Sequence, residues 1–115
     1  MAGFDRIDRI SAEVARELDR ILRDEVHDPR LSGTWSILRA EVTRDLRYAK
    51  IYVSVFPFEQ NAAVMATLEQ HNWFLRRALG QRIRNQLKTV PEIQFFLDDS
   101  LEYIEQIDRA MHREE

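Results

Sequence analysis

The chain has 115 residues, of which 44% are hydrophobic and 32% are charged, and its formal net charge is -3. This length allows one domain with one modest hydrophobic core. Three glycines and three prolines are too few for a linker or a disordered low-complexity protein. The negative net charge argues against a protein that coats nucleic acid through bulk charge. Any binding of nucleic acid must therefore come from a local basic patch.

The chain contains no cysteine, which excludes a disulfide framework and a thiolate metal site. Its N-terminal sequence, MAGFDRIDRI, lacks the apolar core of a signal peptide. No apolar run approaches the length of about 18 residues that a membrane span requires. We therefore expect a cytoplasmic protein that does not contact a membrane.

The first predicted element is a long amphipathic helix from Asp5 to about His27. The face opposite to its apolar residues interleaves arginines with acidic residues, a pattern typical of solvated surface. The pair Asp28-Pro29 is expected to end the helix, because a residue before proline is pushed out of the helical region. The apolar residues recur at steps of three and four positions, as on one helix face: Ile7, Ile10, Val14, Leu18, Ile21, Leu22 and Val26.

A hairpin of two strands is predicted next, joined by a polar turn at residues 44–46. In the first strand, Thr34 to Thr43, the alternating set is Leu38, Ala40 and Val42. The second strand, Tyr48 to Phe56, alternates throughout, and one face consists of Ala49, Ile51, Val53 and Val55. The opposite face is aromatic and mildly basic and consists of Tyr48, Lys50, Tyr52 and Ser54. Two interpretations fit these side chains: half-buried sheet residues or a base-stacking surface.

A helical pattern runs from Asn61 to about Leu87, and we expect a kink or break at the polar stretch 70–72. Pro91 ends this helical region, and residues 93–97 alternate as a third strand. The connection through helices makes the second and third strands parallel. Residues 99–115 are expected to form an acidic helix and tail, opened by a capping box.

This order of elements predicts an α+β fold, in which a three-stranded mixed sheet carries its helices on one face. The other face of the sheet should be open or lightly covered. Val53 should be central to the core, because it lies midway along the middle strand.

The second half of the helical region is a basic island. Between Glu69 and Glu92 there is no acidic residue, whereas five residues are positively charged: Arg76, Arg77, Arg82, Arg84 and Lys88. At about 100° per residue, Leu75, Leu79 and Ile83 share the side opposite to Arg77, Gln81, Arg84 and Lys88. Unmixed positive charge of this kind is expected where phosphate is the partner, although a solvated face is the simpler alternative.

No pattern of catalytic or metal-binding residues is present. His27, His71 and His112 are far apart in the sequence and lack metal-ligand spacing. Asp98 and Asp99 are better explained as residues that satisfy free N–H groups at a helix start. We therefore expect a protein without catalytic activity, metal or cofactor.

The chain resembles the ribosome-binding factor A family of bacterial small-subunit assembly factors. The resemblance covers nearly the whole chain and rests on four ordered segments: His27-Asp28-Pro29-Arg30-Leu31 after the first helix, Arg44-Asp45-Leu46-Arg47-Tyr48-Ala49-Lys50-Ile51-Tyr52-Val53, Phe74-Leu75-Arg76-Arg77-Ala78-Leu79-Gly80, and Val90-Pro91-Glu92-Ile93-x-Phe95-Phe96-x-Asp98-Asp99-Ser100-Leu101.

The resemblance implies a single type II KH-like domain, αββααβ, over residues 1–115, with 99–115 as an additional acidic helix and tail. Members typically kink at Ala-x-Gly between the two middle helices, and residues 71–73 occupy that place here. The resemblance also implies binding to the small (30S) ribosomal subunit and its 16S rRNA. The implied role is to assist late maturation and 5'-end processing of that RNA without catalysis.

We assign RNA contacts to the basic island and to one lysine of the open sheet face: Arg76, Arg77, Arg82, Arg84, Lys88 and Lys50. We expect a monomer. The competing interpretation is a protein-interaction module whose basic helix binds an acidic protein.

Overall fold

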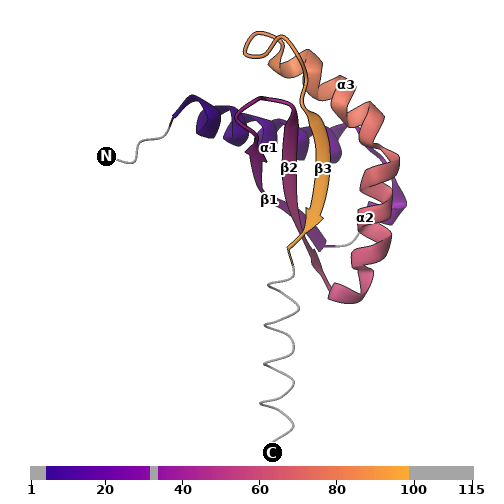
Figure 1. Ribbon diagram of the computed structural model, residues 1–115. Helices are drawn as coiled ribbons and strands as arrows, with labels where there is room; N and C mark the ends of the chain where they lie inside the picture. The colour runs from indigo at the N-terminus through magenta and orange to yellow at the C-terminus, as the bar shows by residue number, and fades with distance from the viewer. Residues whose placement is uncertain (1–4, 32–33, 99–115) are drawn as a thin grey trace, which may run out of the picture.

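The computed structural model describes residues 5–31 and 34–98. The elements are α1 (Arg6–Asp24), β1 (Thr34–Val42), β2 (Tyr48–Phe56), α2 (Asn61–Gln70), α3 (Asn72–Ile83) and β3 (Glu92–Leu97), with single 3₁₀ turns at Pro29–Leu31 and Phe58–Gln60 (Figure 1). This is the predicted αββααβ order. The additional helix predicted for 99–115 lies outside the described residues. No helix in the described part of the chain is long and apolar enough to cross a bilayer.

The three strands form one mixed sheet in the order β1-β2-β3. β1 and β2 are antiparallel, and β2 and β3 are parallel. Val53 lies on the middle strand, where its neighbours across the ladders are Ile37 on β1 and Leu97 on β3. The predicted α+β class, with a type II KH-like arrangement and parallel second and third strands, is confirmed.

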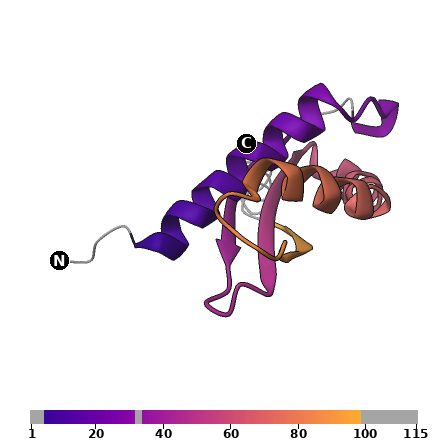
Figure 2. The ribbon, with the colours of Figure 1, turned by 90° about the horizontal axis from the view of Figure 1, so that it is seen from above.

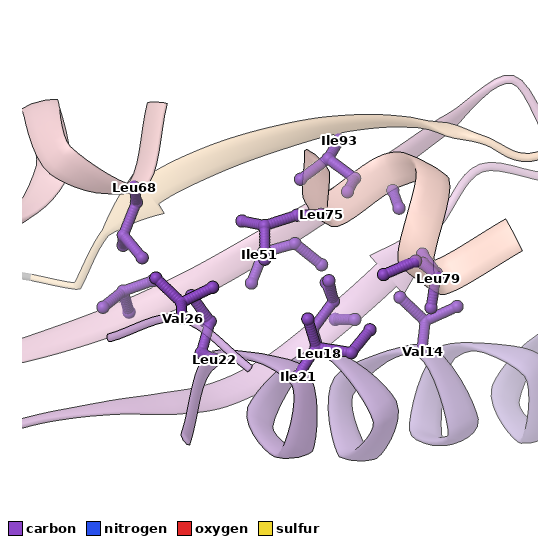
Figure 3. Packing of buried hydrophobic residues seen from close by; sticks show 14 of the residues in the cluster. Val14, Leu18, Ile21, Leu22, Val26, Ile51, Leu68, Leu75, Leu79 and Ile93 are labelled. Atoms are coloured by element: carbon purple, nitrogen blue, oxygen red, sulfur yellow. The ribbon is translucent and has the colours of Figure 1, made fainter. Parts of the chain in front are cut away.

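The helices cover one face of the sheet, and α1 and α3 lie side by side there (Figure 2). The core between these layers draws on every helix and strand (Figure 3). Val53 is fully buried at its centre, as predicted. The other large, fully buried side chains are Val14, Leu18, Ile21 and Leu22 of α1, Ile51 and Val55 of β2, Val64 and Leu68 of α2, and Leu75, Leu79 and Ile83 of α3.

A capping box begins α1. The Asp8 N–H donates to Asp5 Oδ1 at 2.9 Å, and the Asp5 N–H donates to Asp8 Oδ2 at 3.2 Å. The helix ends at Asp24, three residues before the predicted end at His27. Val26 continues the four-residue spacing of the apolar face, but it reaches the core from the connection that follows the helix. Periodicity alone therefore placed the helix end too late.

A β-bulge in β1 takes Leu38 out of the predicted alternation with Ala40 and Val42. The pairing with β2 shifts between Ile37 and Arg39, so Leu38 is the extra residue and its side chain is 48% exposed. Because a bulge reverses which residues face the core, Trp35 is buried before it and Ala40 after it. The alternation of the sequence does not reveal this shift.

The helical region breaks at His71, within the stretch predicted for a kink. The His71 N–H still donates to the carbonyls of Thr67 and Leu68, at 3.2 Å and 3.1 Å, and its own carbonyl accepts from the Leu75 N–H at 2.9 Å. Asn72 anchors the start of α3 to the sheet, because its Nδ2 donates to the Ile93 carbonyl at 3.0 Å. The two helices therefore change direction at a polar joint.

The basic helix is shorter than predicted. α3 ends at Ile83, and the N–H groups of Gln86 and Leu87 both donate to the Ile83 carbonyl, at 2.8 Å and 3.0 Å. Lys88 therefore lies in the connection to β3, although the period of α3 placed it on the helix. The close approach of α3 to this connection is possible at Gly80, where a Cβ atom would lie 2.6 Å from Val90 Cγ2.

Candidate nucleic-acid interface

The outward side of α3 carries an exposed basic stripe, which we define as Arg77 and Arg84 together with Lys88 just beyond the helix. All three side chains are exposed, whereas Leu75, Leu79 and Ile83 are buried on the opposite side. The predicted division of the helix into a basic and an apolar side is confirmed.

The basic stripe also carries uncompensated charge. Among the described residues, Arg84 and Lys88 have no hydrogen-bond or ion-pair partner for their side chains. Arg77 lies over the Trp73 ring, with its Cζ 5.5 Å from the ring centroid. An exposed cation without a carboxylate partner keeps its charge available for an anion.

Arg82 differs from the other cations of α3 because it is engaged within the protein. Its Nη1 donates to Glu17 Oε2 at 2.8 Å, and its Nη2 donates to Glu25 Oε2 at 2.6 Å. The hydrogen bonds that Arg82 donates, first to Glu17 and then to Glu25, raise its pKa above the ordinary value. This side chain joins α3 to α1, so its charge is largely neutralised.

Arg76 has a mixed position. Its Nη2 donates to the Val90 carbonyl at 2.9 Å, which ties α3 to the connection before β3. A backbone carbonyl carries no net charge, so the guanidinium keeps its positive charge. Arg76 therefore remains available for an anion on the side where it borders a groove.

That groove, with a volume of about 850 Å³, lies between the end of α3, the start of α1 and the β1–β2 turn. Its lining includes two carboxylates, Asp45 and Glu92, and five cations: Arg6, Arg47, Arg76, Arg84 and Lys88. We call it the basic groove. Tyr48 adds a partly exposed aromatic ring.

Two cations of the basic groove were not predicted as RNA-binding residues: Arg6 and Arg47. The Arg6 Nη2 donates to the Gln86 carbonyl at 3.4 Å, which brings the start of α1 to the end of α3. A distance of 80 residues in the sequence hides this proximity. The sequence offered one local signal for Arg47. Arg44 and Arg47 both lie in the connection between two predicted strands, where two cations are expected to be exposed at the end of the hairpin.

Asp45 shapes the turn that presents Arg47. The Thr43 hydroxyl and then the Arg47 N–H donate to Asp45 Oδ1, at 2.7 Å and 3.1 Å, and they lower the pKa of this carboxyl. The Asp45 carboxylate is therefore hydrogen-bonded within the turn. Its ion pair with the Arg47 side chain is long, at 3.9 Å.

Lys50 lies apart from the basic stripe. It is half-buried on β2 and faces the open side of the sheet, between Glu41 on β1 and Gln94 on β3. On this face the rings of Tyr52 and Phe96 stack with their centroids 5.6 Å apart. The predicted RNA-binding residues therefore do not form one surface, because Lys50 lies on the face of the sheet opposite to the helices.

The open sheet face has its own internal partners. The Arg39 guanidinium lies 4.0 Å from the centroid of Tyr52, whose hydroxyl donates to Glu41 Oε2 at 3.2 Å. Ser36 and Ser54 share a hydrogen bond of 3.0 Å. These contacts favour the interpretation of half-buried sheet residues over that of a free stacking surface.

His71 pairs with the connection after α1. Its Nε2 lies 2.9 Å from Asp28 Oδ2, and Asp28 also accepts from Arg30 Nη2 at 2.7 Å. The hydrogen bonds from Arg30 and then His71 hold the pKa of Asp28 well below its ordinary value. Residues 5–31 and 34–98 contain no cluster of three or more His, Asp or Glu residues that could hold a metal ion.

Comparison with known proteins gives a consistent result. Residues 6–111 match the family model described as Ribosome-binding factor A. The ribosome-binding factor A of Acetivibrio thermocellus is 48% identical over 100 residues, which are 86% of this chain and 80% of that protein. The protein of the same name from Clostridium novyi is 42% identical over 99 residues, which are 85% and 80% of the two chains.

Solved structures share the fold. A solution structure of a Thermotoga maritima protein, described as a putative ribosome binding factor A, has a TM-score of 0.72 and 27% identity, and the match covers 84% of this chain and 90% of that one. A homology model of the Thermus thermophilus ribosome binding factor A (RbfA), fitted into the cryo-EM map of a 30S–RbfA complex, has a TM-score of 0.62 and 24% identity, and the match covers 77% of this chain and 91% of that one. On the extent of these sequence matches, the chain belongs to the ribosome-binding factor A family.

Proposed function

We propose that this protein is an assembly factor that binds the small ribosomal subunit through its 16S rRNA. In this proposal it assists late maturation and 5'-end processing of that RNA without catalysing a reaction. The protein acts as a monomer, without metal or cofactor, in the bacterial cytoplasm. Residues 1–115 form the KH-like RNA-binding domain, with 99–115 as an acidic extension.

The observation that carries the proposal is the charge of the basic stripe, which has no carboxylate partner among residues 5–31 and 34–98, in a protein whose net charge is negative. RNA offers a dense array of phosphates, and each phosphate that a cation neutralises releases counterions. The relative from Thermus thermophilus, whose fold is similar, has been placed in a complex with the 30S subunit. A phosphate-rich partner of this kind fits both observations.

The basic groove extends the same surface. Arg84 and Lys88 belong to both the basic stripe and the groove lining. The groove adds Arg6 and Arg47, so cations from α1, the β1–β2 turn and α3 converge on one region. Arginine can bind phosphate through two parallel N–H groups and can stack on bases, which suits an irregular RNA.

Co-sedimentation with purified small and large subunits tests the proposal. We expect binding to small subunits that protein-free 16S rRNA competes away and that ribonuclease treatment abolishes. Binding that resists the RNA competitor but yields to the extracted small-subunit proteins would contradict RNA recognition. That result would instead support a protein-interaction module.

The role in maturation has a separate test in cells. Depletion of the protein should cause accumulation of small subunits whose 16S rRNA has an unprocessed 5' end. Wild-type protein should restore processing, and a variant that cannot bind the subunit should not. Normal 5' ends in depleted cells would overturn this part of the proposal.

A further inference from the structure

Trp73 is exposed to a degree that the fold does not explain. Its side chain is 72% exposed, more than any other large hydrophobic side chain among the described residues. Trp35, by contrast, is 8% exposed, and its indole N–H donates to the Leu31 carbonyl at 2.6 Å. An indole left in water loses the free energy that its burial would provide. The described part of the chain leaves most of Trp73 exposed, which points to an occupant from outside that part.

Arg77 lies over one side of the Trp73 indole. The guanidinium carbon lies 5.5 Å from the ring centroid, within the range of a cation–π contact. Arg77 is one helical turn after Trp73, a spacing that brings two side chains together. Because most of the ring surface remains exposed, a flat group can still stack on the indole.

Trp73 also aligns with the basic stripe. At about 100° per residue, Trp73, Arg77 and Arg84 lie within about 40° of one another around the axis of α3. At about 1.5 Å per residue, Arg77 is about 6 Å and Arg84 about 16 Å along the axis from Trp73. The helix therefore presents one aromatic ring followed by two cations on a single line.

We propose that Trp73 is a stacking platform for an unpaired base of ribosomal RNA, and that Arg77 and Arg84 bind phosphates of the same strand. This inference rests on the proposed function and adds a specific contact to it. Every base has a flat π-face, so such a platform accepts single-stranded RNA without selecting its sequence. In a duplex the bases are already stacked, so the platform favours an unpaired segment.

The charges around Trp73 favour RNA over a protein partner. Exposed tryptophans are also frequent anchors of protein interfaces. Here, however, no acidic residue occurs between Glu69 and Glu92. Glu69 itself accepts a hydrogen bond from Asn72 Nδ2 at 3.1 Å. A strand that supplies a flat apolar group and regularly spaced negative charges complements both parts of this surface.

Tryptophan emission gives a direct test, because protein-free 16S rRNA contains no tryptophan. We expect saturating rRNA to quench wild-type emission strongly, and to quench much less in Trp73→Phe, which retains Trp35. Binding of the rRNA is measured in parallel by filter retention. If rRNA binds and the two proteins show equal quenching, the platform is refuted while the proposed function stands. If no rRNA binds, the proposed function fails first.

Affinity variants separate stacking from charge. Trp73→Ala should weaken rRNA binding by about 5- to 150-fold, whereas Trp73→Phe should retain most of the affinity because a ring remains. Neither variant should change the slope of log K against log salt, because neither removes a charge. Phe96→Ala, which changes a 40% exposed ring on the open sheet face, is the matched control and should have little effect.

Two outcomes would assign Trp73 to something else. If Trp73→Ala weakens binding to intact small subunits but not to protein-free rRNA, the indole docks on a ribosomal protein. If Phe96→Ala weakens rRNA binding and Trp73→Ala does not, the stacking surface is the open sheet face. Either result overturns the inference.

Discussion

Arg82 and Glu17 join the two long helices of the protein, with Arg82 Nη1 2.8 Å from Glu17 Oε2. The carboxylate belongs to a residue that is 8% exposed, and it also accepts from Arg20 at 3.3 Å. Arg82 was predicted as an RNA-binding residue, yet its position makes it a link between α3 and α1. Arg82 is therefore bonded within the fold, whereas Arg84 and Lys88 have no such partner among the described residues.

Arg82→Gln should therefore reduce stability more than RNA affinity. Removal of the two ion pairs should cost about 1 kcal/mol in the free energy of unfolding, because the Arg82 side chain is 34% exposed and solvent screens it. Urea denaturation measures this change. Arg84→Gln, which removes the cation at the C-cap of the same helix that has no partner in the described part of the chain, is the control and should show the reverse pattern. If Arg82→Gln weakens RNA binding more than Arg84→Gln, our division of the cations is wrong.

The pairing of Asp28 predicts a dependence of stability on acidic pH. Arg30 and His71 lower the pKa of this carboxyl below its ordinary value of 3.8. Its contribution to stability should be fully present above pH 3.8 and should decline as the pH falls further, because the unfolded state then binds a proton that the folded state does not.

Asp28→Asn tests this linkage. We expect the wild type to be more stable at neutral pH and the difference to shrink below pH 3.8. Arg30→Gln, which removes the largest cause of the lowered pKa, should shift the acid limb of the stability curve toward higher pH. A stability difference between wild type and Asp28→Asn that stays constant across the acidic range would contradict the pairing.

Val53→Asp should abolish cooperative unfolding. The side chain is fully buried on the middle strand, and a charge there without a partner costs several kcal/mol, on the order of the stability of a small domain. Ser54→Asp, one residue further along on the open face, is the control and should still unfold cooperatively. Circular dichroism during thermal unfolding distinguishes these outcomes. Cooperative unfolding of Val53→Asp would contradict the assignment of this face of β2 to the core.

Gly80→Ala should lower the melting temperature, although alanine is the better helix former by about 1 kcal/mol. The added Cβ would lie 2.6 Å from Val90 Cγ2, and valine is stiff about χ1, so the connection before β3 must move. In a Val90→Ala background the same change should raise the melting temperature. Equal effects of Gly80→Ala in both backgrounds would show that the contact does not limit the packing.

The sequence predicted the elements whose patterns are local. The second strand was predicted with its observed bounds because Ala49, Ile51, Val53 and Val55 alternate without interruption. The break at His71 was also predicted, because a polar stretch interrupted the helical pattern. Local periodicity and turn residues carry this information within a few positions.

Features that depend on distant residues were missed or misplaced. The bulge that exposes Leu38 depends on pairing with β2, and the pairing of Arg82 depends on side chains at least 57 residues away. Lys88 was placed on the helix because its spacing continued the pattern beyond Ile83. The basic groove could not be predicted from local patterns, because Arg6 and Lys88 are brought to the same groove only in the folded chain.

RNA binding by the basic stripe is tested most directly by the salt dependence of small-subunit binding in a variant in which Arg77, Arg84 and Lys88 are all changed to Gln. The matched control changes Arg9, Arg16 and Arg20 of α1 to Gln, which removes the same charge from an exposed surface. Exposed substitutions of this kind usually alter stability by about 0.5 kcal/mol each. Both variants should therefore remain folded.

The test variant should bind more weakly, and its slope of log K against log salt should become shallower by about 0.7 to 0.9 for each phosphate that the protein no longer neutralises. The control should retain nearly the wild-type affinity and slope. If the test variant keeps the wild-type affinity and slope, or if the control weakens binding to the same extent, the basic stripe is not the RNA-binding surface.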